Sequence, residues 1–344
     1  MKYFNIAGFK LWLTTLVLCF GSHTQAKEIR FNDIVLDVLD AQKIIVTGFK
    51  GSVKLLPSQT PGKMIIHAKK IIDDKKQASE DNWTFGAKHE DKNIKLEVRG
   101  PDAQSSSDDL KQVTTEIQFE IEAPNLPFDI AWREGSISIQ NWNSSLNIVL
   151  LEGNLTLSHC GASIHIQNEA GEVRVSNHKG RVEIEGLKSK VFISDFDGSL
   201  RIKNFAGDST LDKVSASVHI QTKLGTSHIT KSEGSLEIEN GKGAFNILDF
   251  NGQIRGQNED GSITAKILGD VDVSLESTSG SMSFKLPEGS AAFAKLQSED
   301  GQITTPDSFK TGKIGTLKVA TGRFTGSEKG SILLKSKTGS LRVH

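Results

Sequence analysis

The chain has few cysteines, a single tyrosine and no strongly basic segment. Its 344 residues include two cysteines, Cys19 and Cys160, and Tyr3 is the one tyrosine. If residues 1–26 are a signal peptide, the mature chain keeps one cysteine and no tyrosine, which excludes an intrachain disulfide. No segment is basic enough to suggest nucleic acid as a partner, and no apolar run after residue 26 is long enough to cross a membrane as a helix.

The first 26 residues have the pattern of a secretory signal peptide. Lys2 and Lys10 precede an apolar run over 11–20, and the segment ends at the small residue Ala26. We therefore predict cleavage near Ala26 and an extracytoplasmic location, in the periplasm or at the outer surface. The apolar run is short for a membrane anchor, and Leu18 before Cys19 is too large for a lipoprotein signal. Cleavage leaves 39 Lys and Arg against 42 Asp and Glu, a net charge of −3.

A nine-residue repeat runs without insertion from Gly135 to Asp270. Of the 16 unit starts, 11 are Gly and four are Ala or Ser, and the pattern breaks at Asp270. In the 15 units before the break, the third position is apolar in 13 and the fifth is a large aliphatic in 13. Two apolar positions separated by one polar residue predict a short strand with one face in a core and the other in water. The seventh position is Asn or Asp in eight units, which suits a turn because these residues tolerate left-handed backbone.

A nine-residue unit cannot bury its own apolar face, so the units are expected to stack. The predicted fold is an all-β, single-stranded β-solenoid of the β-helix or β-roll type. Two units per coil are favoured, because an offset of 18 residues alternates opposite charges at the fourth position, whereas an offset of 27 places Arg174 over Arg201. Three units per coil remain an alternative. At the 18-residue offset the fourth-position column is Asn147, His165, Glu183, Arg201, His219, Glu237 and Arg255, and the eighth-position column is Trp142, Cys160, His178, Phe196, Val214, Ser232, Phe250 and Leu268.

The remaining sequence flanks the strict repeat on both sides. Residues 27–130 lack the nine-residue spacing but alternate as strands do, and a solenoid needs a covered end, so we predict a strand-rich N-terminal cap. Residues 131–344 form the predicted repeats, strict over 135–270 and looser over 271–344. In the looser part, Gly-Ser or Gly-Thr followed by apolar residues recurs, which predicts the same strands with longer turns.

A resemblance to a known family rests on three features taken together. They are the predicted signal peptide, the alternating segment 114–124 that ends in Pro and leads into 128–139, and the recurring Gly-Ser-apolar-x-apolar pattern. This combination resembles the bacterial putative-adhesin domains of unknown function, which are described as adhesin-head-like β-solenoids. The resemblance covers roughly residues 30–344. It implies the architecture, and it supplies no catalytic residues.

Six residues are candidate contacts for a partner. Phe192 occupies an outward fourth position, where an exposed aromatic can mark a contact surface. Trp132 lies beside the first coil and could stack on a sugar ring, although packing between the N-terminal region and the repeats is the alternative role. The other four share one face under 18-residue stacking, either as a solvated charge ladder or as a group for acid-base chemistry on a polysaccharide: Glu183, Arg201, Glu237 and Arg255.

The sequence gives no pattern for a metal or another cofactor, and we predict none. Calcium-binding nonapeptide rolls repeat Gly-Gly-x-Gly-x-Asp, whereas the turns here carry Gly-Ser and scattered aspartates. The histidines show no spacing typical of metal ligands. Cys160 falls in the mostly apolar eighth-position column, which predicts a buried hydrophobic side chain rather than a reactive thiol.

Two functions fit these observations. The first is a non-enzymatic, secreted β-solenoid of the cell envelope that acts as an adhesin or as a surface or periplasmic scaffold, with an unidentified protein or glycan as partner. The second is a carbohydrate-active β-helix enzyme of the polysaccharide lyase or hydrolase type. Strict nine-residue spacing leaves no room for the long loops that usually wall a catalytic cleft, so the sequence favours the first.

Overall fold

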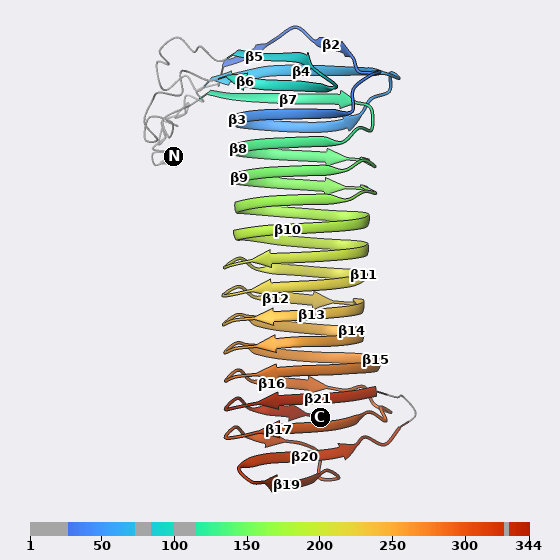
Figure 1. Ribbon diagram of the computed structural model, residues 1–344, viewed down its shortest axis with the longest axis vertical. Helices are drawn as coiled ribbons and strands as arrows, with labels where there is room; N and C mark the ends of the chain where they lie inside the picture. The colour runs from blue at the N-terminus through green and yellow to red at the C-terminus, as the bar shows by residue number, and fades with distance from the viewer. Residues whose placement is uncertain (1–26, 73–83, 100–114, 327–329) are drawn as a thin grey trace, which may run out of the picture.

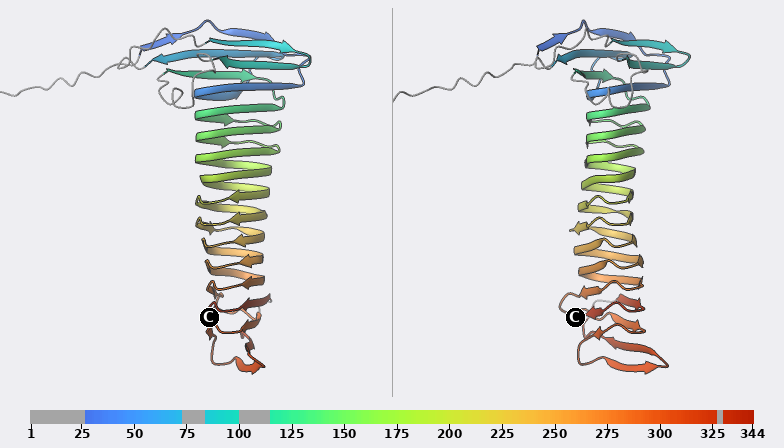
Figure 2. Two further views of the ribbon diagram at one scale, coloured as in Figure 1. Left: turned by 60° about the vertical axis from the view of Figure 1, so that its left-hand side comes forward. Right: turned by 90° about the vertical axis from the view of Figure 1, so that its left-hand side faces the viewer.

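The computed structural model describes residues 27–72, 84–99, 115–326 and 330–344, so the predicted signal peptide lies outside the described residues. Within these ranges the chain is all-β and contains no helix, which confirms the predicted class. Figure 1 shows the strands stacked in one tall column, and Figure 2 shows a broader layer of strands at its N-terminal end. The strands are β1 (Lys27–Arg30), β2 (Ile34–Asp37), β3 (Lys43–Pro57), β4 (Lys63–Ile72), β5 (Thr84–Glu90), β6 (Asn93–Arg99), β7 (Thr115–Ala123), β8 (Phe128–Gln140), β9 (Leu146–Ser158), β10 (Ile164–Asn204), β11 (Ser209–Thr222), β12 (Ser227–Thr230), β13 (Glu233–Asn240), β14 (Ala244–Asn258), β15 (Ser262–Ser277), β16 (Met282–Lys285), β17 (Phe293–Ser298), β18 (Ile303–Thr304), β19 (Lys310–Ile314), β20 (Leu317–Arg323), β21 (Gly330–Ser336) and β22 (Leu341–Val343).

Parallel pairing at an offset of 18 residues holds the column together. Leu146 of β9 pairs with Ile164 of β10, Leu200 of β10 with Val218 of β11, and Leu236 of β13 with Ile254 of β14. The pairing joins residues that are two nine-residue units apart, which is the offset that the alternating charges predict, and we call each such pair of units a coil. Because each strand is bonded to the coils on both sides, the backbone groups between coils are satisfied along the whole stack.

The apolar third and fifth positions point into the narrow space between the two strands of each coil. Ile166, Ile184, Ile202 and Ile220 are all fully buried. The eighth position also points inward, with Trp142, Cys160, His178 and Phe196 among its members. The core is thus a set of parallel columns of side chains, each member stacked on the residue one coil away.

Leu268 does not join the eighth-position column as predicted. The pairing of β14 with β15 shifts by one residue, so that Phe250 lies beside Ile267 and Gly252 beside Val271. Ile267 is buried, whereas Leu268 is 44% exposed. Side chains alternate between the two faces of a strand, so a shift of one residue moves a side chain to the other face. Between the two register shifts Leu268 therefore points outward.

The two corners of each coil use different chemistry. One corner carries a non-glycine residue with φ between 47° and 58° in seven successive coils: Asn141, His159, Asn177, Asp195, Lys213, Lys231 and Asp249. At the opposite corner, asparagines of the same repeat position are buried instead, including Asn168, Asn204, Asn240 and Asn258. The tolerance of Asn and Asp for left-handed backbone, which the sequence suggests for the seventh position, is therefore used at one corner and not at the other.

Glycine is required where successive coils approach most closely. Gly135 and Gly153 have φ of 135° and 142°, and a Cβ on Gly153 would lie 1.8 Å from the carbonyl oxygen of Gly135. No side chain fits in that space, which explains the recurrence of glycine at the unit starts.

The stack begins earlier than the strict repeat does. β3 pairs in parallel with β8, with Gly51 beside Gly135, so β3 already forms a strand of the column. The other edge of β3 is covered by β6 and β7, and β4 extends this layer antiparallel to β7, β1 and β2. This arrangement covers strand edges at the N-terminal end of the column.

The C-terminal end departs from the predicted order. β21 lies between β15 and β17, parallel to both, and β22 lies between β16 and β18 in the same way. The chain therefore leaves one layer open after β16, builds β17 to β20 further along the axis, and returns to fill the open layer with its last residues (Figure 1). The expectation that 271–344 continues as looser coils in sequence order is wrong.

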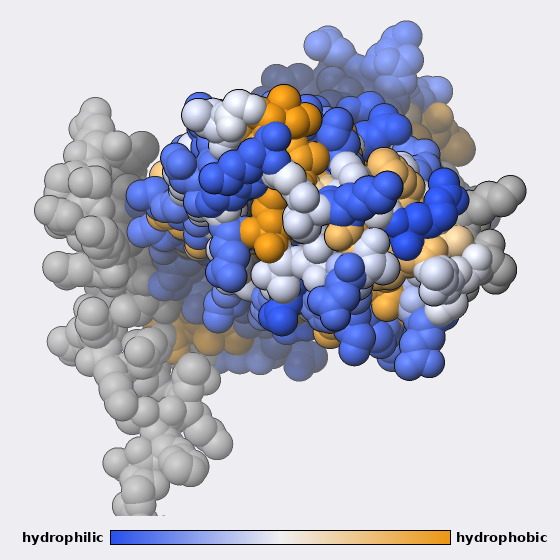
Figure 3. All heavy atoms as spheres, turned by 90° about the horizontal axis from the view of Figure 1, so that it is seen from below, coloured by the Kyte–Doolittle hydropathy of each residue, from blue (hydrophilic) through white to orange (hydrophobic). Residues whose placement is uncertain are grey.

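A β-hairpin closes this end of the column. β20 pairs antiparallel with β17 and with β19, and every residue of β19 is exposed. The segment Gly315-Thr-Leu-Lys-Val, which matches the repeat in sequence, therefore forms an antiparallel strand rather than another coil. Viewed along the axis from this end, the surface is mostly hydrophilic with a few apolar groups (Figure 3).

Candidate functional site

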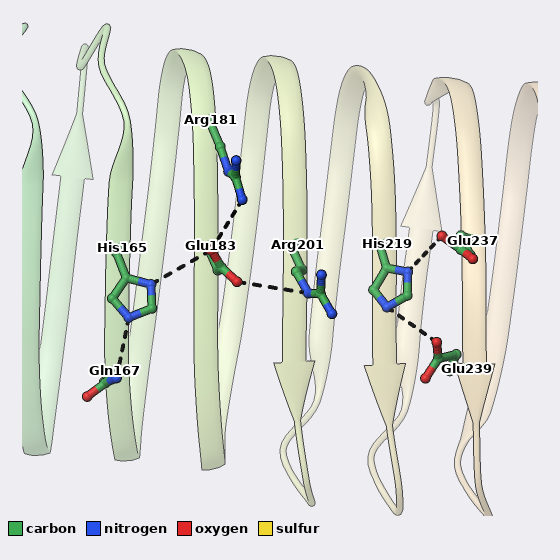
Figure 4. Close-up of polar contacts among 8 residues, drawn as sticks. All are labelled: His165, Gln167, Arg181, Glu183, Arg201, His219, Glu237 and Glu239. Carbon is green, nitrogen blue, oxygen red and sulfur yellow. Dashed lines mark hydrogen bonds and ion pairs between the residues drawn. The ribbon is translucent and has the colours of Figure 1, made fainter.

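Strand alternation brings the predicted charged residues onto one outer face. His165, Glu183, Arg201, His219 and Glu237 follow one another from coil to coil, with their side chains pointing away from the core (Figure 4). We call this set, together with Arg255, the charged column. The structure thus brings together four of the six residues that the sequence singles out: Glu183, Arg201, Glu237 and Arg255.

The N-terminal part of the charged column, from His165 to Arg201, forms ion pairs within itself. Glu183 has a basic group on three sides: its carboxylate lies 4.0 Å from His165 Nδ1, 3.5 Å from Arg181 Nη2 and 3.9 Å from Arg201 Nε (Figure 4). These groups are partly exposed, and solvent-exposed ion pairs each contribute about 0–1 kcal/mol. Such a ladder fixes the register of neighbouring coils more than it adds to stability.

The last ion pairs of the charged column join His219 to Glu237 and Glu239. His219 Nδ1 lies 2.9 Å from the Glu237 carboxylate, and His219 Nε2 lies 3.7 Å from Glu239 (Figure 4). Arg255 is next to Glu237 in register, yet it forms no ion pair or hydrogen bond with any residue that the structure describes. The charged column therefore ends in an available guanidinium.

A hollow of about 750 Å³ lies at this unpaired end of the charged column. Its floor includes Glu237, Arg255 and Ser274 at the fourth position. A second polar column, two residues further along each strand, crosses it in register: Lys203, Gln221, Glu239, Gln257 and Glu276. Within the described chain, Lys203, Gln221 and Gln257 have no hydrogen bond or ion pair to another side chain, so these groups are available to a ligand.

Loops that leave the strands form the side of the hollow. Phe205, Lys223, Gly241 and Glu259 come from four successive loops, and Figure 1 shows these loops projecting in a row from one edge of the column. Lys223 Nζ reaches past Gly241 to Glu259, at 3.2 Å. Phe205 is 51% exposed, which is unusual for an aromatic side chain in this chain.

Buried asparagines hold the loops in place. Asn240 Nδ2 donates to the carbonyl of Gly243 at 2.8 Å and to Asn258 Oδ1 at 2.6 Å, and Asn258 Nδ2 donates to the carbonyl of Gly261 at 2.7 Å. Backbone bonds also link the loops, for example from Leu224 N to the Phe205 carbonyl at 2.9 Å. These bonds tie successive loops to one another, so the hollow is formed before any ligand arrives, although Asn240 Oδ1 itself has no hydrogen-bond partner within the described residues.

One loop glycine leaves room for the hollow. Of the four loop residues that repeat every 18 positions, Phe205, Lys223, Gly241 and Glu259, Gly241 is the one without a side chain. Gly256 also lines the hollow, but it stands at the inward-facing fifth position, where the coils before it have Ile, and its φ is 144°. A Cβ there would lie 1.9 Å from the carbonyl oxygen of Ile238, so the close approach of the two coils requires glycine at this position.

The two aromatic candidates are less accessible than a contact role needs. Trp132 is 2% exposed, donates from Nε1 to the carbonyl of Glu134 at 3.1 Å and packs edge-on against Phe119. This position fits the alternative role of packing between the N-terminal layer and the stack. Phe192 is half-buried beneath the guanidinium of Arg174, whose Cζ lies 4.2 Å from the ring centroid. The cation already occupies the face of that ring.

The single cysteine of the described chain is structural. Cys160 is buried, as predicted, and burial raises the pKa of its thiol above the usual value. A thiol kept protonated is a poor nucleophile and a poor metal ligand. The described residues contain no group of three or more His, Cys, Asp or Glu side chains placed to hold a metal ion. They also contain no helix long and apolar enough to span a membrane.

Comparison with known proteins gives similarities to solved structures at low sequence identity and low TM-score. No protein-family model and no curated protein matches the chain. Three solved structures are similar to it: a "putative adhesin" from Parabacteroides merdae ATCC 43184 (11% identity, TM-score 0.29, 94% of this chain and 97% of that one), a "putative cell adhesion protein" from Clostridium sporogenes ATCC 15579 (12%, 0.22, 93% and 99%) and a "putative lipid binding protein" from Parabacteroides distasonis ATCC 8503 (11%, 0.27, 91% and 96%).

Proposed function

We propose that this protein is a secreted, non-enzymatic β-solenoid of the bacterial cell envelope that acts as an adhesin or a scaffold. The observation that carries the proposal is the unbroken parallel stack, whose outer faces present polar side chains in register from coil to coil. An elongated column with a rigid core displays a surface at a distance from its point of attachment.

The hollow beside Arg255 is the most suitable place on the column for a partner. It is preformed, it contains polar groups without partners within the described chain, and it carries an exposed aromatic side chain. Binding sites commonly combine a concave shape with a few available polar groups. In the N-terminal part of the charged column the groups already pair with one another, which supports the interpretation as a solvated charge ladder over a group for acid-base chemistry.

Cell fractionation combined with surface proteolysis tests the location. The mature protein should appear outside the cytoplasm, and a protease added to intact cells should cleave it if it is at the outer surface. Protection until the outer membrane is opened would place it in the periplasm and favour the scaffold role over adhesion. Recovery in the cytoplasm would contradict the proposal.

A carbohydrate-active enzyme is the second candidate, and one observation favours it. The hollow brings the carboxylates of Glu237, Glu239, Glu259 and Glu276 to one surface, and glycoside hydrolysis uses a pair of carboxylates. Incubation with polysaccharides and measurement of new reducing or unsaturated ends tests it. Turnover that is lost in Glu239→Gln would establish the enzyme, and an unchanged substrate would leave the non-enzymatic proposal in place.

A further inference from the structure

We infer that the hollow binds a neutral oligosaccharide chain that lies along the axis of the column. The inference rests on the proposed function, because it names the chemical class of partner that the display surface takes. Three features of the hollow point to this class: the kind of polar groups it offers, their repetition along the axis, and the exposed aromatic ring at one end.

The available polar groups suit hydroxyls. Gln221 and Gln257 each offer two N–H donors and an acceptor oxygen, and Arg255 offers a planar set of donors. Sugar hydroxyls both donate and accept, so planar side chains that present both functions at fixed spacing bind adjacent hydroxyls. Because none of these three side chains has a partner within the described chain, a ligand satisfies them without breaking an existing contact.

The repetition of the polar groups suits a polymer. Gln221, Glu239 and Gln257 lie directly beside one another in three successive coils. Neighbouring strands in a sheet are about 4.8 Å apart, so these three side chains form a ladder with that spacing. A ligand made of repeating units meets a similar side chain at each step, which gives many modest contacts rather than one strong contact.

Phe205 supplies an apolar platform at one end of the ladder. Its ring is half exposed and lies in the loop that follows Lys203, at the edge of the hollow. The C–H face of a sugar ring packs on the face of an aromatic side chain, since the negative π surface attracts the weakly positive C–H groups. Phe192, on the opposite strand of the coil, cannot present this ring face to a sugar because the guanidinium of Arg174 covers it.

The hollow is poorly suited to other polymers. An extended peptide usually adds to a free strand edge, whereas β13 is bonded to β11 on one side and β14 on the other, so no edge is free here. A polyanion such as a nucleic acid or an acidic glycan needs a positive surface. Three cations, Lys203, Lys223 and Arg255, face four glutamates in the hollow, and the net charge is negative.

Binding of defined oligosaccharides to the full mature chain tests the inference. The probes are immobilised neutral hexasaccharides of glucose, mannose, xylose and N-acetylglucosamine, with hexagalacturonate as the acidic comparison. At least one neutral hexasaccharide should bind, and shortening the chain to a disaccharide should weaken binding. Phe205→Ala and Gln257→Ala should each weaken binding about two- to tenfold, because the first removes one aromatic contact and the second removes the hydrogen bonds of one side chain.

Phe192→Ala is the matched control, because it removes an aromatic ring from the same stack away from the hollow. It should leave sugar affinity unchanged, and thermal melting should show that all variants fold. The inference is overturned if no neutral hexasaccharide binds, if the acidic one binds better, or if Phe205→Ala and Gln257→Ala bind like the parent. A protein that is found outside the cytoplasm but binds no sugar would remove this inference alone, whereas a cytoplasmic protein that binds sugar would remove the proposed function alone.

Discussion

At the scale of single residues, His178 is the least expected member of the core. It is 1% exposed and stacks on Phe196 with ring centroids 5.4 Å apart, and among the described residues neither ring nitrogen has a partner at normal hydrogen-bond geometry. Desolvation by burial lowers the pKa of His178 below its ordinary value of 6.5. The folded state therefore holds the neutral imidazole, and protonation would place an unpaired charge in an apolar column.

Acid should destabilise the protein through His178. Because the pKa is lower in the folded state than in the unfolded state, the unfolded chain binds the extra proton first. The contribution to stability is complete above about pH 6.5 and is lost as the pH falls through that value towards the folded pKa. His178→Phe should flatten the acid side of a plot of unfolding free energy against pH, measured by denaturant titration.

His228→Phe is the control for this prediction, because His228 is exposed on an outer face. The acid-side slope should persist in that variant. His344, whose pKa burial also lowers, keeps part of the slope in both proteins. If His178→Phe keeps the full slope of the parent, the buried imidazole does not govern acid stability.

At the scale of the repeat element, the same sequence position has two structural roles. The seventh residue of each nine-residue unit adopts left-handed backbone at one corner, as Lys231 does with φ of 47°. Nine residues later, at the opposite corner, Asn240 is buried and donates to Gly243 and Asn258. At the first corner a side chain strains the left-handed backbone. At the second corner the side chain is needed for the hydrogen bonds that hold the loop.

The same substitution should therefore have opposite effects at the two corners. Lys231→Gly should stabilise the protein by up to about 1 kcal/mol, because left-handed backbone costs a non-glycine residue about 1–2 kcal/mol and glycine loses part of that gain in chain entropy. Asn240→Gly should destabilise it by about 1–3 kcal/mol, because buried groups lose their partner. Denaturant unfolding of the two variants measures both signs, and equal shifts would show that the corners are equivalent.

This difference marks how far the sequence predicts the element. The 18-residue offset could be predicted, because opposite charges at Glu183 and Arg201 alternate only at that spacing. The role of each asparagine could not, because Asn177 and Asn240 have the same place in the repeat and differ only in which corner surrounds them. The candidate site was partly visible: Glu237 and Arg255 could be predicted to share a face, whereas Phe205 came from a loop whose projection depends on the buried asparagines.

At the scale of the whole molecule, the order of layers differs from the order of the chain. Residues 330–343 lie between the coil of β15 and β16 and the layer of β17 and β18. The sequence carries a faint signal for this placement: Gly330 and Gly339 are nine residues apart, which is the strict spacing of the central stack. β21 and β22, which keep the strict spacing, pack against β15 and β16. The irregular segment 287–326 lies on the far side of β21 and β22. The spacing alone does not determine this order, because parallel pairing is decided between segments distant in the sequence.

Removal of residues 330–344 should open the C-terminal end and leave the rest of the column folded. β15 and β17 would each lose a parallel partner, and the buried side chains of Leu334 and Leu341 would leave an apolar slot. Limited proteolysis of the truncated protein should cut within 287–326 and spare 131–277, and the full-length protein should resist cleavage in both ranges. A synthetic peptide of residues 330–344 added in trans should restore protection, because it supplies the same backbone pairing to both edges. The peptide with Leu334→Asp and Leu341→Asp should not restore it, since a charge in the slot costs several kcal/mol. A truncated protein with the protease resistance of the parent would show that β17 and β20 hold to the stack without the returning strand.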